Sequence, residues 1–266
     1  MWPTPKPDLS APGARLTLLT LCLLFLAGCG RGTAIVDEGE TGTPQGVLLV
    51  SAASSLTDAF AEIESSFETA NPDVDVVLNL GSTSSLRQQI IEGAPVDVFA
   101  SANTSNMDQV VEAGETVEFE IFARNRLQVA VPAGNPAGIV GLEDFGDEDL
   151  LIGLCSQDVP CGALGRAVLA NAGVTPSIDT SEPDVRALLT KIEAGELDAG
   201  ITYVTDVLST SGVEGVDIPD GINLVADYPI ASLTNAPNPG AASAFVSFVL
   251  SERGQAILNR YGFSSP

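Results

Sequence analysis

The feature that most constrains the fold is a short apolar strand that passes directly into a helix through serines. Val47 to Ser51 is an aliphatic run of strand length, and apolar side chains then recur at helical spacing from Leu56 to Phe67. Ser55 stands three residues before Asp58, a capping-box pattern that predicts the helix start. A helix start offers unpaired N–H groups and the positive end of the helix dipole, so an anion can bind there. An ordinary capped helix gives the same pattern.

The same arrangement recurs further along the chain. Val74 to Leu80 predicts a second strand, and a cluster of hydroxyl side chains at 82–85 follows it and leads into a helix. Val96 to Ala100 predicts a third strand, and Asn103 to Ser105 predicts the cap of a helix that ends near Gly114. Strands that alternate with helices predict an α/β fold with a mostly parallel sheet, in which ligands bind at the carboxyl ends of the strands.

The second half of the chain repeats the pattern with other side chains. The expected elements are strands at Leu150–Leu154 and Ala199–Val204, helices that start near Cys161 and Val185, and two terminal helices at Ala241–Leu250 and Glu252–Arg260. Two long extended stretches, Phe119 to Pro132 and Leu224 to Ala231, differ from the short strands. We expect them to carry the chain from one lobe to another and back.

The composition argues against several classes of function. A formal net charge of −24 disfavours nucleic acid and anionic lipid as partners. The chain has no histidine, so it lacks the usual general base and the commonest transition-metal ligand. Acid/base pairs are conceivable among the carboxylates, such as Asp97, Asp144, Asp184 and Asp206. No P-loop, HExxH or GxSxG motif accompanies them, so we expect no enzyme.

Residues 1–28 have the pattern of an export signal, because Lys6 and Arg15 precede an uncharged apolar run that is too short to span a membrane. The run ends in LAGC, which resembles the bacterial lipobox. We therefore expect cleavage before Cys29 and a lipid on that residue, with a plain secreted protein as the alternative. Residues 29–45 would then be the lipid anchor and a flexible tether, and the protein would lie on the outer face of the cell membrane.

Cysteine usage fits an oxidising exterior. Cys22 would leave with the signal and Cys29 would be lipidated, so Cys155 and Cys161 remain as a pair in CSQDVPC. We predict a disulfide between them, with two free thiols as the alternative, and expect it to stabilise the fold by about 2 kcal/mol. The spacing does not match a redox CxxC motif or a zinc site.

Hydrogen-bond donors from both halves of the chain form a candidate site. The helix starts at Ser55, Thr83, Cys161 and Val185 and the phenol of Tyr203 all supply neutral donors. If they converge on one cleft, they make a dry oxyanion site of backbone N–H groups and hydroxyls, and dipoles fixed in place need no reorganisation when the ligand enters. Such a site should reject phosphate, whose proton would find no acceptor.

The segments around these residues resemble, in order, those of the periplasmic molybdate-binding proteins of ABC importers. They are SAASSLTDAF, GSTSSLRQQIIEGAPVDVFASA, DVPCG, EPDVRALL, AGITYVTDV and RYGF, and the resemblance runs from about Gly46 to Phe263. It implies a two-lobed class II solute-binding protein, each lobe a mostly parallel sheet flanked by helices, with a two-stranded hinge. The expected boundaries are 46–124 and 228–266 for lobe 1 and 125–227 for lobe 2, with the hinge near Ala123–Leu127 and Ala226–Pro229.

The resemblance also implies the function. Such a protein closes on molybdate or tungstate as a monomer without a cofactor and delivers the anion to a membrane permease, while other subunits hydrolyse ATP. The family's ligand contacts fall here on Ser55, Thr83, Cys161, Val185 and Tyr203, so the only metal expected is the molybdenum of the bound oxyanion.

Two of these positions depart from the family pattern. Thr83 stands where serine is usual, which keeps the hydroxyl and adds a methyl group. Cys161 stands where alanine is usual, which is compatible with a backbone contact that leaves the side chain for the disulfide. Neighbouring serines are expected as helix caps and as donors behind the contact residues: Ser54, Ser82, Ser84 and Ser85.

Arg186 is the basic side chain next to a predicted contact. An anion site built on arginine would suit a smaller, more charged oxyanion, but we favour an ion pair with Asp184 or another carboxylate, which places Arg186 behind the contact residues. Two alternatives to molybdate transport stay open, namely another tetrahedral oxyanion such as sulfate, and a surface adhesion lipoprotein with no transport role. A large exposed apolar patch without a bound oxyanion would favour the second.

Overall fold

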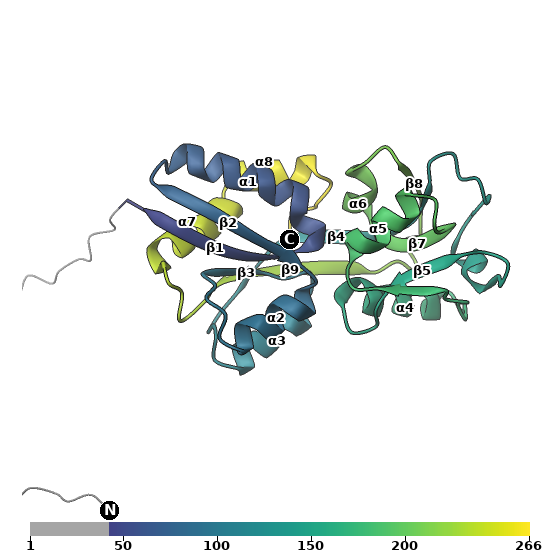
Figure 1. The fold of residues 1–266 in the computed structure, drawn as a ribbon, viewed down its shortest axis with the longest axis horizontal. Coiled ribbons are helices and arrows are strands. Elements are labelled where there is room, and N and C mark those ends of the chain that lie inside the picture. The colour runs from purple at the N-terminus through teal and green to yellow at the C-terminus, as the bar shows by residue number, and fades with distance from the viewer. Residues whose placement is uncertain (1–42) are drawn as a thin grey trace, which may run out of the picture. The chain divides into compact units, whose positions relative to one another are not determined.

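Two groups of parallel strands, linked by two long antiparallel strands, make up the structure (Figure 1). The computed structural model describes residues 43–266. The predicted export signal, the lipidation at Cys29 and the predicted tether up to residue 42 lie outside the described residues. Within residues 43–266, none of the helices combines the length and the apolar character that a membrane span requires.

The first lobe is built on the predicted alternation of strands and helices. Its strands β1 (Gly46–Ala53), β2 (Val74–Gly81) and β3 (Val98–Ala100) are parallel, with β1 in the middle. The helices of this lobe are α1 (Thr57–Ala70), α2 (Thr83–Ile91), α3 (Thr104–Glu112), α7 (Pro239–Leu250) and α8 (Glu252–Arg260). The two terminal helices therefore return the chain to the lobe in which it started.

The second lobe has the same plan. Its strands β5 (Ile152–Cys155), β6 (Thr180–Glu182) and β7 (Ala199–Tyr203) are parallel, and its helices include α4 (Pro160–Asn171) and α5 (Val185–Glu193). Five short elements were not predicted: the 3-10 turns η1 (Ser54–Leu56) and η2 (Leu142–Gly146), helix α6 (Val204–Leu208), and strands β6 and β8 (Val213–Val216).

Two long strands connect the lobes, as the extended stretches in the sequence predicted. In β4 (Glu120–Pro132), the first part pairs with β9 (Val225–Ser232), and the second part pairs with β7 and β8. The pairing of β4 with β9 is antiparallel and includes Arg124 opposite Asp227, whose side chains form an ion pair at 2.8 Å. The predicted crossing points at 123–127 and 226–229 lie within these paired strands.

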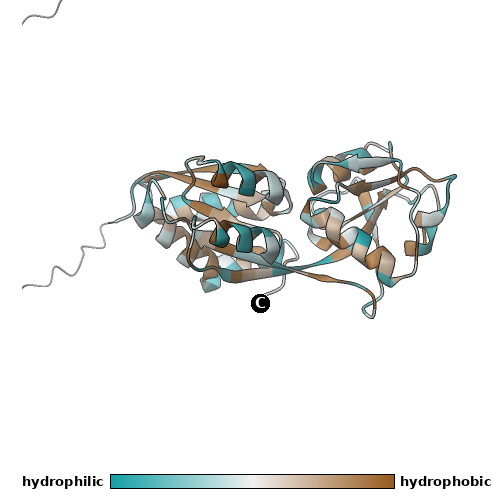
Figure 2. Cartoon of the chain, turned by 90° about the horizontal axis from the view of Figure 1, so that it is seen from below, coloured by the Kyte–Doolittle hydropathy of each residue, from teal (hydrophilic) through white to brown (hydrophobic). Residues whose placement is uncertain are grey.

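Aromatic rings fill the core of the first lobe. The ring centroid of Phe60 lies 5.9 Å from that of Phe122 on β4 and 6.1 Å from that of Phe245 on α7. Phe67 lies 5.2 Å from Phe245, and all four side chains are fully buried. These separations are typical of favourable tilted and edge-to-face pairs. Figure 2 shows the matching pattern of hydropathy, with mostly hydrophobic strands and helices that carry both kinds of residue.

The prediction of a capping box at Ser55 and Asp58 is wrong. The chain first makes the 3-10 turn η1, so α1 begins at Thr57, and no side chain caps it. The Ser55 hydroxyl lies instead 2.9 Å from the hydroxyl of Tyr228 on β9. Because this partner is distant in the sequence, the local pattern at the helix start did not reveal it.

Candidate ligand-binding site

A small cavity lies between the two lobes, and residues of both lobes line it. The first lobe contributes Ala53, Ser54, Ser55, Gly81, Ser82, Thr83 and Ala102, and the second contributes Val159, Pro160, Cys161, Asp184, Val185 and Tyr203. All five residues predicted to contact a ligand are among them. The space open to the centre of a water-sized sphere is about 10 Å³, which corresponds to about one water molecule.

Helix starts face this cavity because α2 and α5 each begin at a lining residue. The first N–H groups of a helix have no partner within the helix. Ser82 caps α2 by accepting the N–H of Ser85 at 3.2 Å, and Asp184 caps α5 by accepting the N–H groups of Arg186 and Ala187 at 2.9 and 3.0 Å. In both helices the cap satisfies later N–H groups and leaves the first, at Thr83 and Val185, available to a ligand.

The hydroxyl of Thr83 is already oriented by the protein. Its Oγ1 accepts the N–H of Ala102 at 3.1 Å, and the side chain is 1% exposed. The hydroxyl hydrogen is then free to be donated to another acceptor, since the oxygen uses a lone pair for Ala102.

The predicted disulfide between Cys155 and Cys161 is confirmed. The two Cα atoms lie 5.8 Å apart, and the bond joins the end of β5 to the first turn of α4. The turn is tight, because a Cβ atom on Gly162 would lie 1.9 Å from the carbonyl oxygen of Ser156. Arg166 holds the same turn by donating to the carbonyl of Cys155 at 2.7 Å. Cys161 therefore lines the cavity while its side chain is used for the disulfide.

Replacing both cysteines by alanine is expected to lower the free energy of unfolding by about 2 kcal/mol, because the bond restricts the unfolded chain over a short loop. Urea unfolding of the wild-type protein with and without dithiothreitol, compared with the Cys155→Ala/Cys161→Ala variant, measures the effect. The reductant should lower the stability of the wild-type protein to that of the variant and leave the variant unchanged. Equal stability of all samples would contradict the prediction.

Tyr203, at the end of β7, brings an unsatisfied hydroxyl to the cavity. The residue is 1% exposed, and its phenol oxygen has no hydrogen-bond partner among residues 43–266. Burial, together with the neighbouring Tyr228 and Asp206, raises the pKa of Tyr203 well above its usual value, so the phenol keeps its proton. A buried hydroxyl without a partner costs about 1–3 kcal/mol. Such a group is expected where a ligand supplies the missing acceptor.

The serines around the contacts have several roles. Ser82 is a helix cap, whereas Ser84 donates its hydroxyl to the carbonyl of Asp158 in the other lobe at 2.5 Å. The carbonyl of Ser54 accepts the hydroxyl of Thr57 at 2.6 Å. Ser85 accepts the Ser82 hydroxyl at 2.8 Å.

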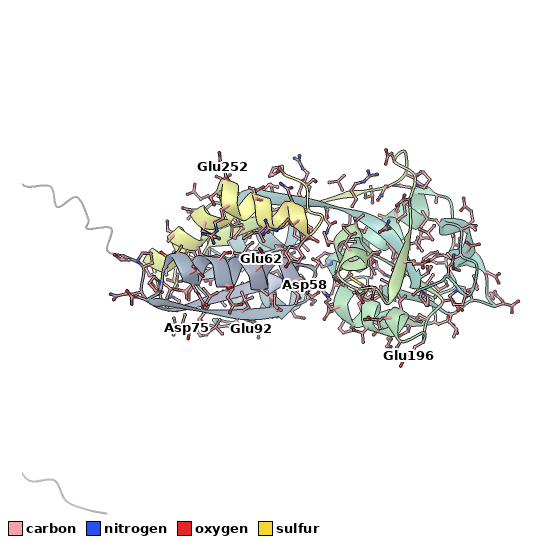
Figure 3. The ribbon with its side chains drawn as sticks, turned by 90° about the horizontal axis from the view of Figure 1, so that it is seen from above. Asp58, Glu62, Asp75, Glu92, Glu196 and Glu252 are labelled. Carbon is pink, nitrogen blue, oxygen red and sulfur yellow. A yellow bond between two sulfur atoms is a disulfide. The ribbon has the colours of Figure 1, made fainter. Side chains whose placement is uncertain are left out.

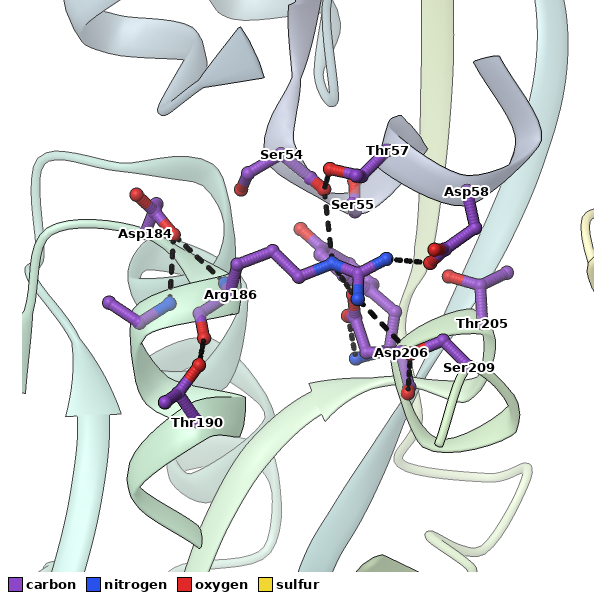
Figure 4. A network of polar contacts seen from close by, with 12 residues as sticks. Ser54, Ser55, Thr57, Asp58, Asp184, Arg186, Thr190, Thr205, Asp206 and Ser209 are labelled. Carbon is purple, nitrogen blue, oxygen red and sulfur yellow. Dashed lines mark hydrogen bonds and ion pairs between the residues drawn. The ribbon is translucent and has the colours of Figure 1, made fainter. Parts of the chain in front are cut away.

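Arg186 lies beside the cavity but does not line it. Its guanidinium forms an ion pair with Asp58, and its Nε lies 3.9 Å from Asp206 (Figure 4). The predicted ion pair is therefore present, with Asp58 as the partner, because the Asp184 carboxylate caps α5. Burial raises the pKa of Asp206 to about 7, although the backbone N–H of Tyr203 and the Arg186 cation both lower it.

The lining thus offers neutral donors together with one carboxylate, Asp184, and within residues 43–266 it includes no lysine or arginine. The same residues contain no group of three or more His, Cys, Asp or Glu side chains able to hold a metal ion. Tyr228 and Asp206 were not predicted as part of the site. The Tyr228 hydroxyl lies within hydrogen-bond distance of the Ser55 hydroxyl, and the Asp206 carboxylate accepts the backbone N–H of Tyr203. Their roles depend on the pairing of β9 and on the burial of α6, and the sequence carries no local signal of either.

Two lobes of mixed α/β structure, two paired connecting strands and a cavity between the lobes at which two helices begin define a solute-binding protein of the periplasmic type. Residues 48–264 match the family described as bacterial extracellular solute-binding protein, and the chain belongs to this family. Members of this family bind solutes outside the cytoplasm.

The molybdate-binding protein ModA of Mycobacterium tuberculosis H37Rv is 35% identical over 245 residues, which cover 91% of this chain and 93% of that protein. The structure of the Azotobacter vinelandii periplasmic molybdate-binding protein superimposes with a TM-score of 0.71 at 17% identity, covering 82% and 99% of the two chains. The sulfate-binding protein SubI of M. tuberculosis gives a TM-score of 0.75 at 17% identity, covering 82% and 86%. The two structural likenesses support the fold, and the predicted fold class is confirmed.

Proposed function

We propose that this protein captures molybdate, and also tungstate, in the cavity between its lobes and delivers the anion to the permease of an ABC importer. The observation that carries the proposal is the donor set of the cavity, above all the buried Tyr203 hydroxyl that has no partner among residues 43–266. In this proposal Ser55, Thr83, Cys161, Val185 and Tyr203 donate to the anion. The likeness to relatives named for molybdate binding supports this choice of ligand.

The chemistry of the lining favours a fully ionised tetrahedral oxyanion. Phosphate near neutral pH carries a proton that needs an acceptor, and the cavity offers mainly donors. The Asp184 carboxylate lines the cavity, but one of its oxygens already accepts two N–H groups. Sulfate carries no such proton, so its exclusion depends on cavity size and donor spacing. Sulfate is therefore the competing ligand to test.

The proposal extends to cellular location and architecture. The protein would be exported, cleaved before Cys29 and held on the outer face of the membrane by a lipid on that residue, as a monomer. Lobe 1 would comprise 46–124 and 228–266, and lobe 2 would comprise 125–227, hinged at the paired strands β4 and β9. Closure of the lobes would enclose the anion, and opening at the permease would release it.

Isothermal titration of residues 30–266 with molybdate, tungstate, sulfate and phosphate tests the function. We expect tight binding of molybdate and tungstate and no measurable binding of the other two anions. Sulfate or phosphate binding as tightly as molybdate would refute the proposed specificity. No heat with any of the four anions would refute the oxyanion site itself.

Thr83→Ala is expected to weaken molybdate binding by about 10- to 100-fold, because a hydrogen bond to a charged group contributes about 1.5–3 kcal/mol. Thr83→Ser is the matched control, since serine keeps both the donor and the acceptor for Ala102. The same titration should give wild-type affinity for the serine variant. Equal affinities of all three proteins would show that the Thr83 hydroxyl does not contact the anion.

A further inference from the structure

The side chain of Arg186 bridges the two lobes next to the cavity. It belongs to α5 of the second lobe, and two of its nitrogens bind groups of the first lobe: one pairs with the Asp58 carboxylate on α1, and Nε donates to the carbonyl of Ser54 at 3.3 Å. The remaining contacts are within the second lobe, to Ser209 at 3.2 Å and to Asp206 at 3.9 Å. Figure 4 shows the guanidinium between these partners. Each of its nitrogens has a protein partner, and the residue does not line the cavity.

The pair of Arg186 and Asp58 differs from the other ion pairs among residues 43–266. Lys191 pairs with Glu182 and Arg126 pairs with Asp220 within the second lobe, Arg260 pairs with Glu62 within the first lobe, and Arg124 pairs with Asp227 between the two connecting strands. Arg186 and Asp58 join a helix of one lobe to a helix of the other. Figure 3 shows Asp58 at the end of α1 that faces the second lobe, and Glu62 further along the same helix.

The surroundings of the pair make it stronger than an exposed one and also easy to release. The side chain of Arg186 is 26% exposed and that of Asp58 is 40% exposed, so water screens the pair only in part. When the lobes separate, Arg186 would lose Asp58 and Ser54 but keep Asp206, which is fully buried in its own lobe. The cation would therefore have a carboxylate beside it in either arrangement of the lobes.

We propose that Arg186 is a positioning residue that latches the two lobes together over the bound anion through Asp58 and the carbonyl of Ser54, without contacting the anion itself. The latch rests on the proposed function, because it sets how long the anion stays bound. It follows that loss of the latch speeds release of the ligand and leaves capture and selectivity unchanged. A cation in contact with the anion would change all three.

The test is the rate at which radiolabelled molybdate leaves residues 30–266 when it is chased with unlabelled molybdate. Arg186→Met and Asp58→Asn should each raise the release rate by about tenfold with little change in the association rate, as expected when a partly buried charge pair is broken. The double variant should release no faster than Arg186→Met alone, because that change already removes the interaction with Asp58. Arg186→Lys should restore part of the slow release, since one ammonium can still reach one carboxylate.

Two controls separate the latch from general effects. Lys191→Met removes an ion pair from the same helix within the second lobe and should release molybdate at the wild-type rate. Arg186→Met leaves the buried Asp206 without its neighbouring cation and can therefore destabilise the fold. Asp58→Asn keeps Arg186 beside Asp206, so it tests the latch without this effect. Thermal unfolding without ligand should show Asp58→Asn close to wild type. Raised salt should speed release from the wild-type protein more than from Asp58→Asn.

The possible failures are distinguishable. If the wild-type protein does not bind molybdate, the proposed function is wrong. If it binds and both single variants release the anion at the wild-type rate, the latch alone is wrong. If Arg186→Met abolishes capture while Asp58→Asn behaves as wild type, Arg186 contacts the anion and the latch is again refuted.

Discussion

Tyr203→Phe is expected to weaken molybdate binding by about 10- to 100-fold, since a hydrogen bond to a charged ligand contributes about 1.5–3 kcal/mol. The same change should raise the melting temperature of the ligand-free protein by a few degrees. The reason is that the phenol oxygen is buried without a partner among residues 43–266, and removing such a group relieves its desolvation cost. Titration calorimetry and thermal unfolding without ligand measure the two effects. Their opposite signs distinguish a ligand donor from a structural hydroxyl.

The matched control is Tyr261→Phe, which removes the same atom from a tyrosine that does not line the cavity. This variant should bind molybdate as the wild-type protein does. Unchanged affinity of Tyr203→Phe would show that its phenol does not contact the anion. A lower melting temperature for that variant would show that the hydroxyl has a partner within the protein.

The second large effect is a pH dependence of stability that arises from Asp206. Burial raises the pKa of this carboxyl to about 7 in the folded protein, and the nearby Asp58 and Asp184 add to the rise. In the unfolded chain the pKa is about 3.9. Between these values the folded state holds more protons than the unfolded state, so the free energy of unfolding falls as pH rises. Asp206 therefore contributes fully to the free energy of unfolding below about pH 4, and this contribution is lost by about pH 7. The change amounts to up to about 4 kcal/mol.

The variant Asp206→Asn isolates this contribution. Asparagine can still accept the N–H of Tyr203, which Asp206 accepts at 3.0 Å. The other carboxylates are common to both proteins, so the difference between their urea unfolding curves from pH 4 to pH 8.5 reports on Asp206. We expect the variant to gain stability relative to the wild-type protein up to about pH 7 and to keep a constant advantage above it. A flat difference would mean that Arg186 keeps Asp206 ionised despite its burial.

Much of the fold could be predicted from the sequence because its signals are local. The pattern of a strand that ends in hydroxyl residues and leads into a helix spans only about 20 consecutive residues. This pattern correctly placed β1, β2 and the helices that follow them. The long apolar alternation of β4 likewise predicted a strand that connects two lobes. Strand β8 was missed because VEGV is short and contains glycine, and it is held by pairing with the end of β4.

The candidate site could be predicted in part for a related reason. The five predicted contact residues lie at element ends, and the topology brings those ends to one cavity. The error at Ser55 came from a long-range contact, because a buried tyrosine 173 residues away takes the hydroxyl that the local pattern assigned to a cap. Asp58 was likewise assigned to the cap, whereas it pairs with Arg186 of the other lobe. At both residues, a contact with a residue distant in the sequence replaces the helix cap that the local pattern predicted.

The position of β9 also determines the order in which the lobes can be completed when the chain becomes available from its N-terminus onward. In the sheet, β9 stands between β3 and β4, but in the chain it follows every strand of the second lobe. Helices α7 and α8 come later still, and Phe245 of α7 completes the ring cluster around Phe60. The lobe that begins first is therefore finished last. A chain that stopped after β8 would hold every strand and helix that belongs to the second lobe alone, beside a first lobe that still lacks a strand and two helices.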